Sequence, residues 1–255
     1  MNKPIHYFVV CLLLVASLQA DAEPELYQAS SPDHRTAMLE LYTSEGCSSC
    51  PPADEWLSRL KQIDEIVPLA FHVTYWDYIG WQDPYGDTRF DSRQREISRH
   101  NSSSTIYTPQ FVLDGKDYRS YRRFSEDIDK VVSQPAPVDL GISAMVNEGR
   151  ANVTMDINIA NTPLKDVAMY LAIYENNLSS QISAGENQGR KLRHDFVVRQ
   201  LYGPFIQSQP NSEGRFRQSV GLLQNWKRKD LNLVLFAQNP HTGEVLQAVK
   251  LAINP

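Results

Sequence analysis

The sequence is poor in cysteine, and this scarcity limits its thiol chemistry. Only three of its 255 residues are cysteines, namely Cys11, Cys47 and Cys50. A four-coordinate structural zinc site needs a second ligand pair, and no further cysteine is present to supply it. Internal repeats and low-complexity tracts are absent as well. Any thiol chemistry therefore depends on these few positions.

A strong charge of either sign is also missing. The 25 Lys and Arg residues stand against 30 Asp and Glu residues, which gives a formal net charge of −5. Proteins that bind nucleic acids through general electrostatic attraction present surface patches rich in Lys and Arg. The mildly acidic balance therefore argues against a nucleic-acid partner.

Long hydrophobic runs are absent except near the N-terminus. Lys3 precedes an apolar run from Phe8 to Ala16, and the small-residue pattern Ala20-Asp21-Ala22 follows it. The run is too short to span a bilayer, and the arrangement is typical of a secretory signal peptide. We expect residues 1–22 to be removed and the remainder to be secreted or periplasmic, without a membrane segment.

The next part of the chain alternates strand and helix patterns. Val67 to Val73 is apolar apart from Pro68 and His72, which is typical of a strand buried on both faces of a parallel sheet. Apolar residues at spacings of three and four indicate helices, and Asp114-Gly115 indicates a hairpin turn. The expected order is strand 38–43, helix 53–63, strand 67–73, helix 87–99, hairpin strands 110–113 and 117–119, and helix 124–131. Residues 36–134 are therefore expected to form an α/β domain.

Pro135-Ala136-Pro137 cannot continue the last helix, so residues 135–137 are expected to be a linker. Beyond it, alternating runs indicate strands at 138–146, 151–159, 167–174, 216–220, 231–237 and 245–253. Strands at this spacing favour an antiparallel sandwich. The predicted fold class is an α/β domain followed by an all-β antiparallel sandwich domain at residues 138–255.

The motif Cys47-Ser48-Ser49-Cys50 lies between the first expected strand and the first expected helix. Free backbone N–H groups and the helix dipole stabilise a thiolate at such a turn, whereas Asp54 and Glu55 oppose one. Cys47 is the predicted nucleophile, and Cys50 is the predicted resolving partner. Because proline is tolerated only in the first turn of an α-helix, the regular helix is expected to begin at Pro51.

Three interpretations of this pair remain open from the residues alone. A structural disulfide would constrain little, because the stabilisation grows with the number of residues in the loop. A non-catalytic binding module could nevertheless keep one. A metal-handling protein could use both thiolates, with soft Cu(I) as the leading ion. The favoured interpretation is a redox pair, although Ser48 and Ser49 carry no charge that would fix the direction of exchange.

Several longer motifs resemble one known family. They are Leu39 to Asp54, His72 to Trp81, Tyr107-Thr108-Pro109-Gln110, and Gly185-Glu186-Asn187 with Leu192, His194 and Val197-Val198-Arg199. The set resembles a secreted thioredoxin-like family known as domain of unknown function 1223. The resemblance implies a thioredoxin fold for the first half, with Pro109 as a cis-proline packed against the cysteines. It also implies that the Thr108 backbone is free to pair with a substrate strand. The chain lacks a Trp before Cys47, so electron donors and partners are not carried over.

The loop from Tyr75 to Tyr85 is rich in aromatic side chains. Loops at the carboxyl ends of parallel strands form sites in α/β sheets, so Trp76 and Trp81 are candidate substrate-binding residues, with a local core as the alternative. His72 lies in an apolar strand and is interpreted as a core residue. His194 is interpreted as part of an edge strand, with a catalytic role as the alternative.

These observations together predict a secreted thiol–disulfide oxidoreductase. Its catalytic residues are Cys47 and Cys50, and its substrate-binding residues are Thr108, Pro109, Trp76 and Trp81. The expected partners are a protein substrate bearing a thiol or disulfide and a redox partner. No cofactor and no metal ligand are expected.

Overall fold

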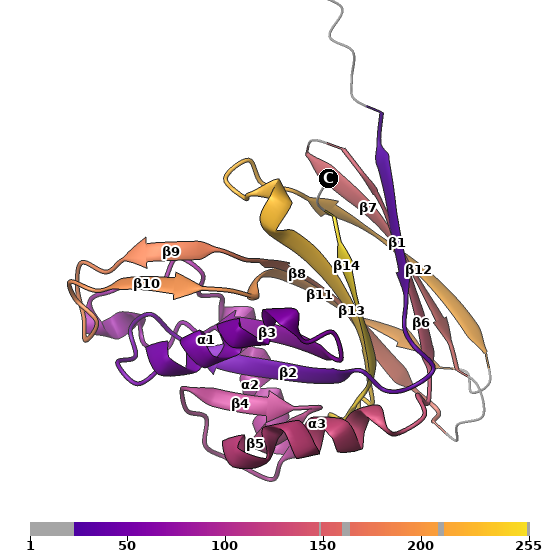
Figure 1. Ribbon diagram of the computed structural model, residues 1–255, viewed down its shortest axis with the longest axis horizontal. Coiled ribbons are helices and arrows are strands. Elements are labelled where there is room, and N and C mark those ends of the chain that lie inside the picture. The colour runs from indigo at the N-terminus through magenta and orange to yellow at the C-terminus, as the bar shows by residue number, and fades with distance from the viewer. Residues whose placement is uncertain (1–22, 148, 160–163, 209–211, 254–255) are drawn as a thin grey trace, which may run out of the picture.

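A computed structural model of the chain describes residues 23–147, 149–159, 164–208 and 212–253 (Figure 1). The expected signal peptide at residues 1–22 lies outside these ranges. Within them the helices are α1 (Pro51–Ser58), α2 (Thr88–His100) and α3 (Phe124–Val132), with 3-10 turns η1 (Arg59–Gln62), η2 (Asp77–Ile79), η3 (Tyr121–Arg123) and η4 (Arg228–Asp230). The strands are β1 (Glu25–Ser30), β2 (Ala37–Thr43), β3 (Ile66–His72), β4 (Gln110–Leu113), β5 (Lys116–Tyr118), β6 (Asp139–Val146), β7 (Arg150–Asn158), β8 (Val167–Glu175), β9 (Leu178–Gln181), β10 (Lys191–His194), β11 (Val197–Gln207), β12 (Glu213–Gly221), β13 (Leu231–Gln238) and β14 (Val245–Ala252).

One large mixed sheet runs through both halves of the chain. Its eight strands lie in the order β14-β13-β8-β11-β3-β2-β4-β5. β2 and β3 are parallel, and β4 is antiparallel to β2. The halves meet where β11 pairs in parallel with β3 at Val197 and Ala70. There the Ala70 N–H donates to the Phe196 carbonyl at 2.8 Å.

The predicted fold class, an α/β domain followed by a separate all-β sandwich, is therefore wrong. No separate thioredoxin-like α/β domain is found among the described residues, because the sheet continues across the expected boundary. Every residue of β3 is buried, so an open edge on β3 would leave backbone groups unpaired away from water. β8 is also buried on both faces: Leu171 and Ile173 point into one core, while Ala172 and Tyr174 point into the other.

A four-stranded antiparallel sheet in the order β1-β6-β7-β12 packs over the β8, β13 and β14 end of the large sheet (Figure 1). Hydrophobic side chains from both sheets form a common core there. β1 comes from the start of the described chain, yet it pairs with β6 of the second half, with Glu25 opposite Val146. Local patterning missed β1, whose side chains are mostly exposed or half-buried.

The segment expected to be a linker runs beside residues 33–35. Pro135 forms an isolated bridge with His34, and the Ala136 N–H donates to the Asp33 carbonyl at 2.9 Å. The division into units 36–134 and 138–255 stays a prediction, which limited proteolysis near Pro135 tests.

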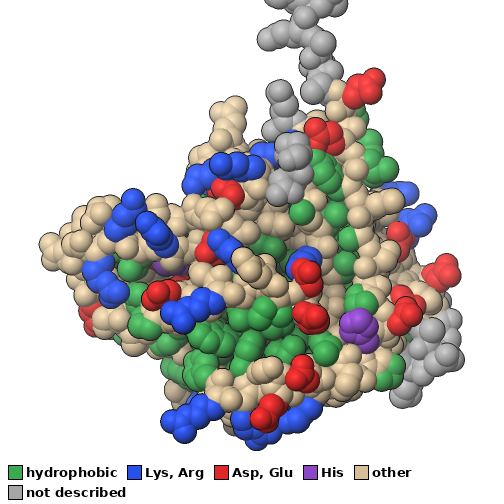
Figure 2. Space-filling model, viewed as in Figure 1, with side chains coloured by type: hydrophobic (Ala, Val, Ile, Leu, Met, Phe, Trp, Pro, Cys, Tyr) green, Lys and Arg blue, Asp and Glu red, His purple; other side chains and the backbone are tan. Residues whose placement is uncertain are grey.

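Charges of both signs are interspersed on the face shown in Figure 2, around hydrophobic side chains that gather between α1 and α3. Trp56 of α1 packs edge-on against Phe124 of α3 in this region, with ring centroids 4.8 Å apart. Within the described ranges, every helix is too short or too polar to cross a membrane.

Candidate functional site

The cysteine pair stands directly before α1. Cys47 and Cys50 are joined by a disulfide, with their Cα atoms 5.4 Å apart. The carbonyl of Cys50 accepts the backbone N–H groups of Ala53 and Asp54 at 2.9 and 3.1 Å. The helix begins at Pro51, which confirms where the two prolines predicted its start.

Both cysteines are buried, with exposed fractions of 1% for Cys47 and 0% for Cys50. Ser48 and Ser49 between them are exposed, and the Ser49 hydroxyl lies 3.2 Å from the Cys47 sulfur. The predicted nucleophile and the predicted resolving cysteine are therefore almost equally buried. A substrate reaches either sulfur only after the covering residues move.

The loop between β9 and β10 is hydrogen-bonded to the backbone of the cysteine loop. The Ser48 N–H donates to Glu186 Oε2 at 3.0 Å. Asn187 Nδ2 donates to the carbonyls of Cys47 and Glu45 at 3.0 and 2.8 Å. We call Glu186 and Asn187 the cover. The resemblance marks both residues, and the structure bonds them to the backbone around Cys47.

Trp76 connects the cysteine loop to Thr108. Its Nε1 donates to Thr108 Oγ1 at 2.7 Å. A side chain at Gly46 would crowd the tryptophan, since a Cβ there lies 3.1 Å from the Trp76 Cβ. The Thr108–Pro109 bond is cis, as the resemblance implies. Pro109 immediately precedes β4, which pairs with β2, the strand that leads to the cysteines.

The aromatic loop divides between surface and interior. Tyr78 is 82% exposed and stacks on Trp76 with ring centroids 6.3 Å apart. Trp81 is instead tied to the interior, because its Nε1 donates to Glu45 Oε2 at 2.9 Å. Trp76 and Tyr78 therefore form an aromatic surface beside the cysteine loop, whereas Trp81 supports a buried carboxyl group.

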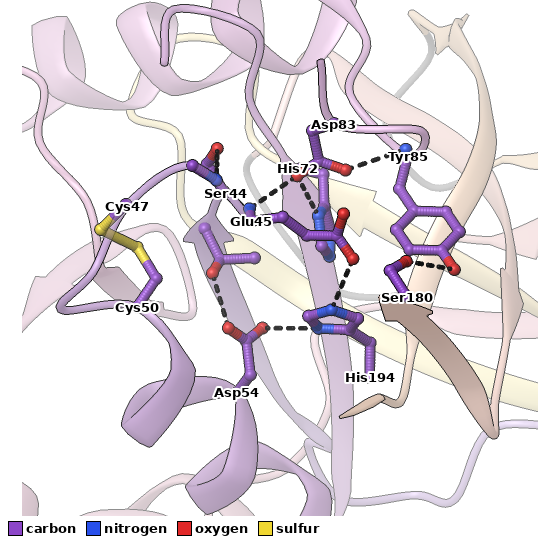
Figure 3. A network of polar contacts seen from close by, with 12 residues as sticks. Ser44, Glu45, Cys47, Cys50, Asp54, His72, Asp83, Tyr85, Ser180 and His194 are labelled. Atoms are coloured by element: carbon purple, nitrogen blue, oxygen red, sulfur yellow. Dashed lines mark hydrogen bonds and ion pairs between the residues drawn. A yellow bond between two sulfur atoms is a disulfide. The ribbon is translucent and has the colours of Figure 1, made fainter. Parts of the chain in front are cut away.

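Five buried side chains form a polar network behind the disulfide: Glu45, Asp54, His72, Asp83 and His194 (Figure 3). We call it the histidine cluster. His72 Nδ1 lies 2.7 Å from Asp83 Oδ2. His194 Nε2 lies 3.0 Å from Glu45 Oε1, and its Nδ1 lies 3.6 Å from Asp54 Oδ1.

The cluster is assembled from distant segments. Glu45 follows β2, His72 ends β3, and Asp54 lies on α1, where Thr43 Oγ1 donates to its Oδ2 at 2.8 Å. Asp83 belongs to the aromatic loop, and His194 ends β10. The sequence interpretation missed Glu45 and Asp83. The signal that could have found them is their place after β2 and β3, because the carboxyl ends of parallel strands meet at one edge of a sheet.

Electrostatics in the cluster favour a charged His194. Burial lowers the pKa of His194, but the carboxyl groups of Asp54 and Glu45 outweigh it and raise this pKa to about 10. Burial raises the pKa of Asp83, but His72 and the backbone N–H groups of Glu45 and Tyr85 hold it below its usual value. At neutral pH a proton on His194 therefore offsets part of the surrounding negative charge.

Two solved structures are similar over most of the chain. Protein AGR_C_4864 from Agrobacterium tumefaciens is 24% identical with a TM-score of 0.63, covering 88% of this chain and 97% of its own. HBP35 of Porphyromonas gingivalis is 14% identical with a TM-score of 0.65, covering 88% of this chain and 76% of its own. At these identities the likeness concerns the fold alone, and no curated protein matches the chain significantly. Residues 38–238 match the family described as protein of unknown function (DUF1223), and the chain belongs to that family.

Proposed function

We propose that this protein is a secreted or periplasmic thiol–disulfide oxidoreductase whose redox centre is Cys47 and Cys50. The observation that carries the proposal is a disulfide between cysteines three residues apart, at the start of a helix. A ring this small restricts the unfolded chain only weakly. A redox-active disulfide therefore explains this cysteine pair better than a stabilising structural disulfide does.

Exchange would take place in two balanced steps. A substrate thiolate attacks the Cys47 sulfur, a mixed disulfide forms, and Cys50 leaves as a thiolate with the electron pair of the broken bond. A second substrate thiolate then attacks the mixed disulfide, so the substrate departs as a disulfide. Cys47 and Cys50 are left reduced, with two electrons and two protons gained. A redox partner reverses these steps, and the relative potentials set the net direction.

The aromatic surface beside the cysteine loop supports binding of a polypeptide substrate. Trp76 and the exposed Tyr78 offer an apolar wall. An extended segment passing along this wall would meet Thr108, whose side chain is bonded to Trp76, and could add backbone hydrogen bonds there. Pro109 would line the same path, and Trp81 would act through Glu45.

Trapping tests this function directly. A Cys50→Ser variant keeps Cys47 as a lone thiol and is expected to hold its substrate as a mixed disulfide, which mass spectrometry identifies. Cys47→Ser is the matched control and should trap nothing. In redox buffers, mass tagging of the wild-type thiols should give a midpoint between about −270 and −120 mV. A pair that stays oxidised in the folded protein against strong reductant, together with an empty trap, would contradict the proposal.

A binding module with a structural disulfide is the second candidate. The burial of both sulfurs favours it, since an inert disulfide needs no access. In that case the function would survive in a Cys47→Ser variant, whereas an oxidoreductase would lose it.

A further inference from the structure

Each histidine of the cluster has one ring nitrogen within hydrogen-bond distance of a carboxyl group. The other ring nitrogen of each lacks a hydrogen-bond partner. Asp83 already accepts the N–H groups of Glu45 and Tyr85, so it acts as an acceptor and the His72 Nδ1–H donates to it. His72 Nε2 is buried and unpartnered. His194 repeats the arrangement in part: its Nε2 lies at Glu45, and its Nδ1 lacks a hydrogen bond but faces Asp54 Oδ1 at 3.6 Å. Histidines that bind a metal are usually held in this way, with the second nitrogen on a carboxylate.

Three buried side chains of the cluster lie close enough together to share one ion. One potential ligand atom each from Asp54, His72 and His194 lies within 4.8 Å of the other two. His194 Nδ1 and Asp54 Oδ1 are 3.6 Å apart, close to the separation of about 3.3 Å between two ligands of a tetrahedral zinc ion with bonds of about 2.0–2.1 Å. A small inward shift of the three side chains would complete such a site.

The charge of the cluster also calls for a cation. Glu45, Asp54 and Asp83 are buried, and their ion-pair partners within the described residues are histidines, with no Lys or Arg among them. The cluster thus places three carboxyl groups beside two imidazoles. Buried charge of this kind is costly unless it is paired or bound to a metal.

We propose that Asp54, His72 and His194 bind a zinc ion, with Asp83 and Glu45 orienting the two histidines. Two imidazoles and one carboxylate are a common zinc donor set that leaves a fourth position for water. The ion takes the place of any proton on His194 Nδ1, because a ligating nitrogen must be unprotonated. The site uses neither cysteine and does not rest on the redox proposal.

Zinc at this site would hold the cover, Glu186 and Asn187, in a fixed position. The ligands come from α1, β3 and β10, so the ion joins the two-stranded sheet of β9 and β10 to the large sheet. The loop between β9 and β10 carries Glu186 and Asn187. Zinc binding is therefore expected to hold this loop over the disulfide.

The test uses tag-free protein with its disulfide intact, so that no thiolate is available as a ligand. The protein is stripped with a chelator, dialysed and titrated with zinc chloride by calorimetry. We expect one zinc ion per chain and a Tm that rises with zinc concentration, since a ligand that binds only the folded state stabilises it.

Variants assign the ligands. Asp54→Asn and His194→Gln are expected to abolish stoichiometric binding. Asp83→Asn keeps all three ligands and should weaken the affinity by about 10–100-fold. His241→Gln is the matched control, since that exposed histidine also lies beside a carboxylate, 3.5 Å from Asp166, and should bind zinc like the wild type.

Circular dichroism first shows that each variant is folded. The wild-type protein is also loaded with cobalt(II) in place of zinc. Its visible absorption spectrum is expected to show four-coordinate geometry. Failure of folded wild-type protein to take up zinc would overturn the proposal. Undiminished uptake by folded Asp54→Asn and His194→Gln variants would do so as well.

Discussion

The cysteine pair and the histidine cluster are neighbours held together by different means (Figure 3). Asn187 bonds to the carbonyls of both Cys47 and Glu45. The cysteines are three residues apart and covalently joined, whereas His194 and Glu45 are 149 residues apart and meet through hydrogen bonding and charge. A neutral disulfide is cheap to bury, whereas buried charges are costly unless paired. The cysteine pair therefore depends only on its own loop, whereas the cluster depends on tertiary contacts between distant segments.

Breaking the cluster should have the largest effect. Glu45→Ala leaves His194 and the Trp81 N–H without their acceptor. We expect it to lower the free energy of unfolding by about 3–5 kcal/mol, the usual cost of removing one partner of a buried pair. Urea denaturation measures this. The control is Glu126→Ala, whose exposed pairing with Arg123 should contribute about 0–1 kcal/mol. Equal losses for the two variants would show that the cluster is not a buried charge network.

Asp114 is a buried carboxyl group that is paired with an arginine and not with a histidine. It therefore provides a contrast with the carboxyl groups of the histidine cluster. Burial raises the pKa of Asp114 to about 6, even though Arg35 lies 3.5 Å away. A carboxyl group whose pKa is higher in the folded state disfavours folding once ionised. Its cost is absent below pH 4, grows as the pH rises to about 6, and is constant above that.

Asp114→Asn should remove this trend. Relative to the variant, the wild type is expected to lose up to about 3 kcal/mol between pH 4 and pH 7. Asn suits the site, because Asp114 has a φ of 47° and Asn tolerates the left-handed region. Urea denaturation across this pH range measures the difference between the two proteins. A constant difference would show that Asp114 titrates normally.

Removing the disulfide should cost less than breaking the cluster. The Cys47→Ala, Cys50→Ala double variant is expected to lose about 2 kcal/mol, the chain-entropy value for a ring of about four residues. Thermal unfolding of the variant is compared with that of wild-type protein with its disulfide intact. A variant that fails to fold would instead identify the disulfide as a structural brace.

Loosening the cover should have the smallest effect on stability and a clear effect on reactivity. Asn187→Ala removes two hydrogen bonds of about 0.5–1.5 kcal/mol each, so the open population and the rate of disulfide reduction should rise by about 5- to 150-fold. The rate is followed with a small phosphine or thiol reductant. Asn158→Ala, which removes an exposed hydrogen bond to Asp139, should leave the rate unchanged.

Local elements could be predicted from the sequence because their signals are local. The strand expected at 110–113 coincides with β4. Asp114 and Gly115 form the expected turn, with φ angles of 47° and 83°. Helices α2 and α3 begin and end within one residue of their expected limits.

The sheet order and the cluster could not be predicted in this way. The apolar pattern of β3 shows that both its faces are buried, but it does not say which strands lie beside it, and one of them is β11 from the second half of the chain. His72 was expected in the core and is buried there. Its partner Asp83 is eleven residues away, and only the path of the aromatic loop brings the two together.

The pairing of Val197 with Ala70 also orders events during synthesis. The chain is made from its N-terminus, so the edge of β3 stays open until the segment around residue 197 has been made. Cys47 and Cys50, being three residues apart, can be oxidised long before then. The histidine cluster cannot exist until residue 194 has emerged. A newly made chain therefore passes through an interval in which its disulfide can close while a hydrophobic strand edge is exposed, and such edges promote aggregation.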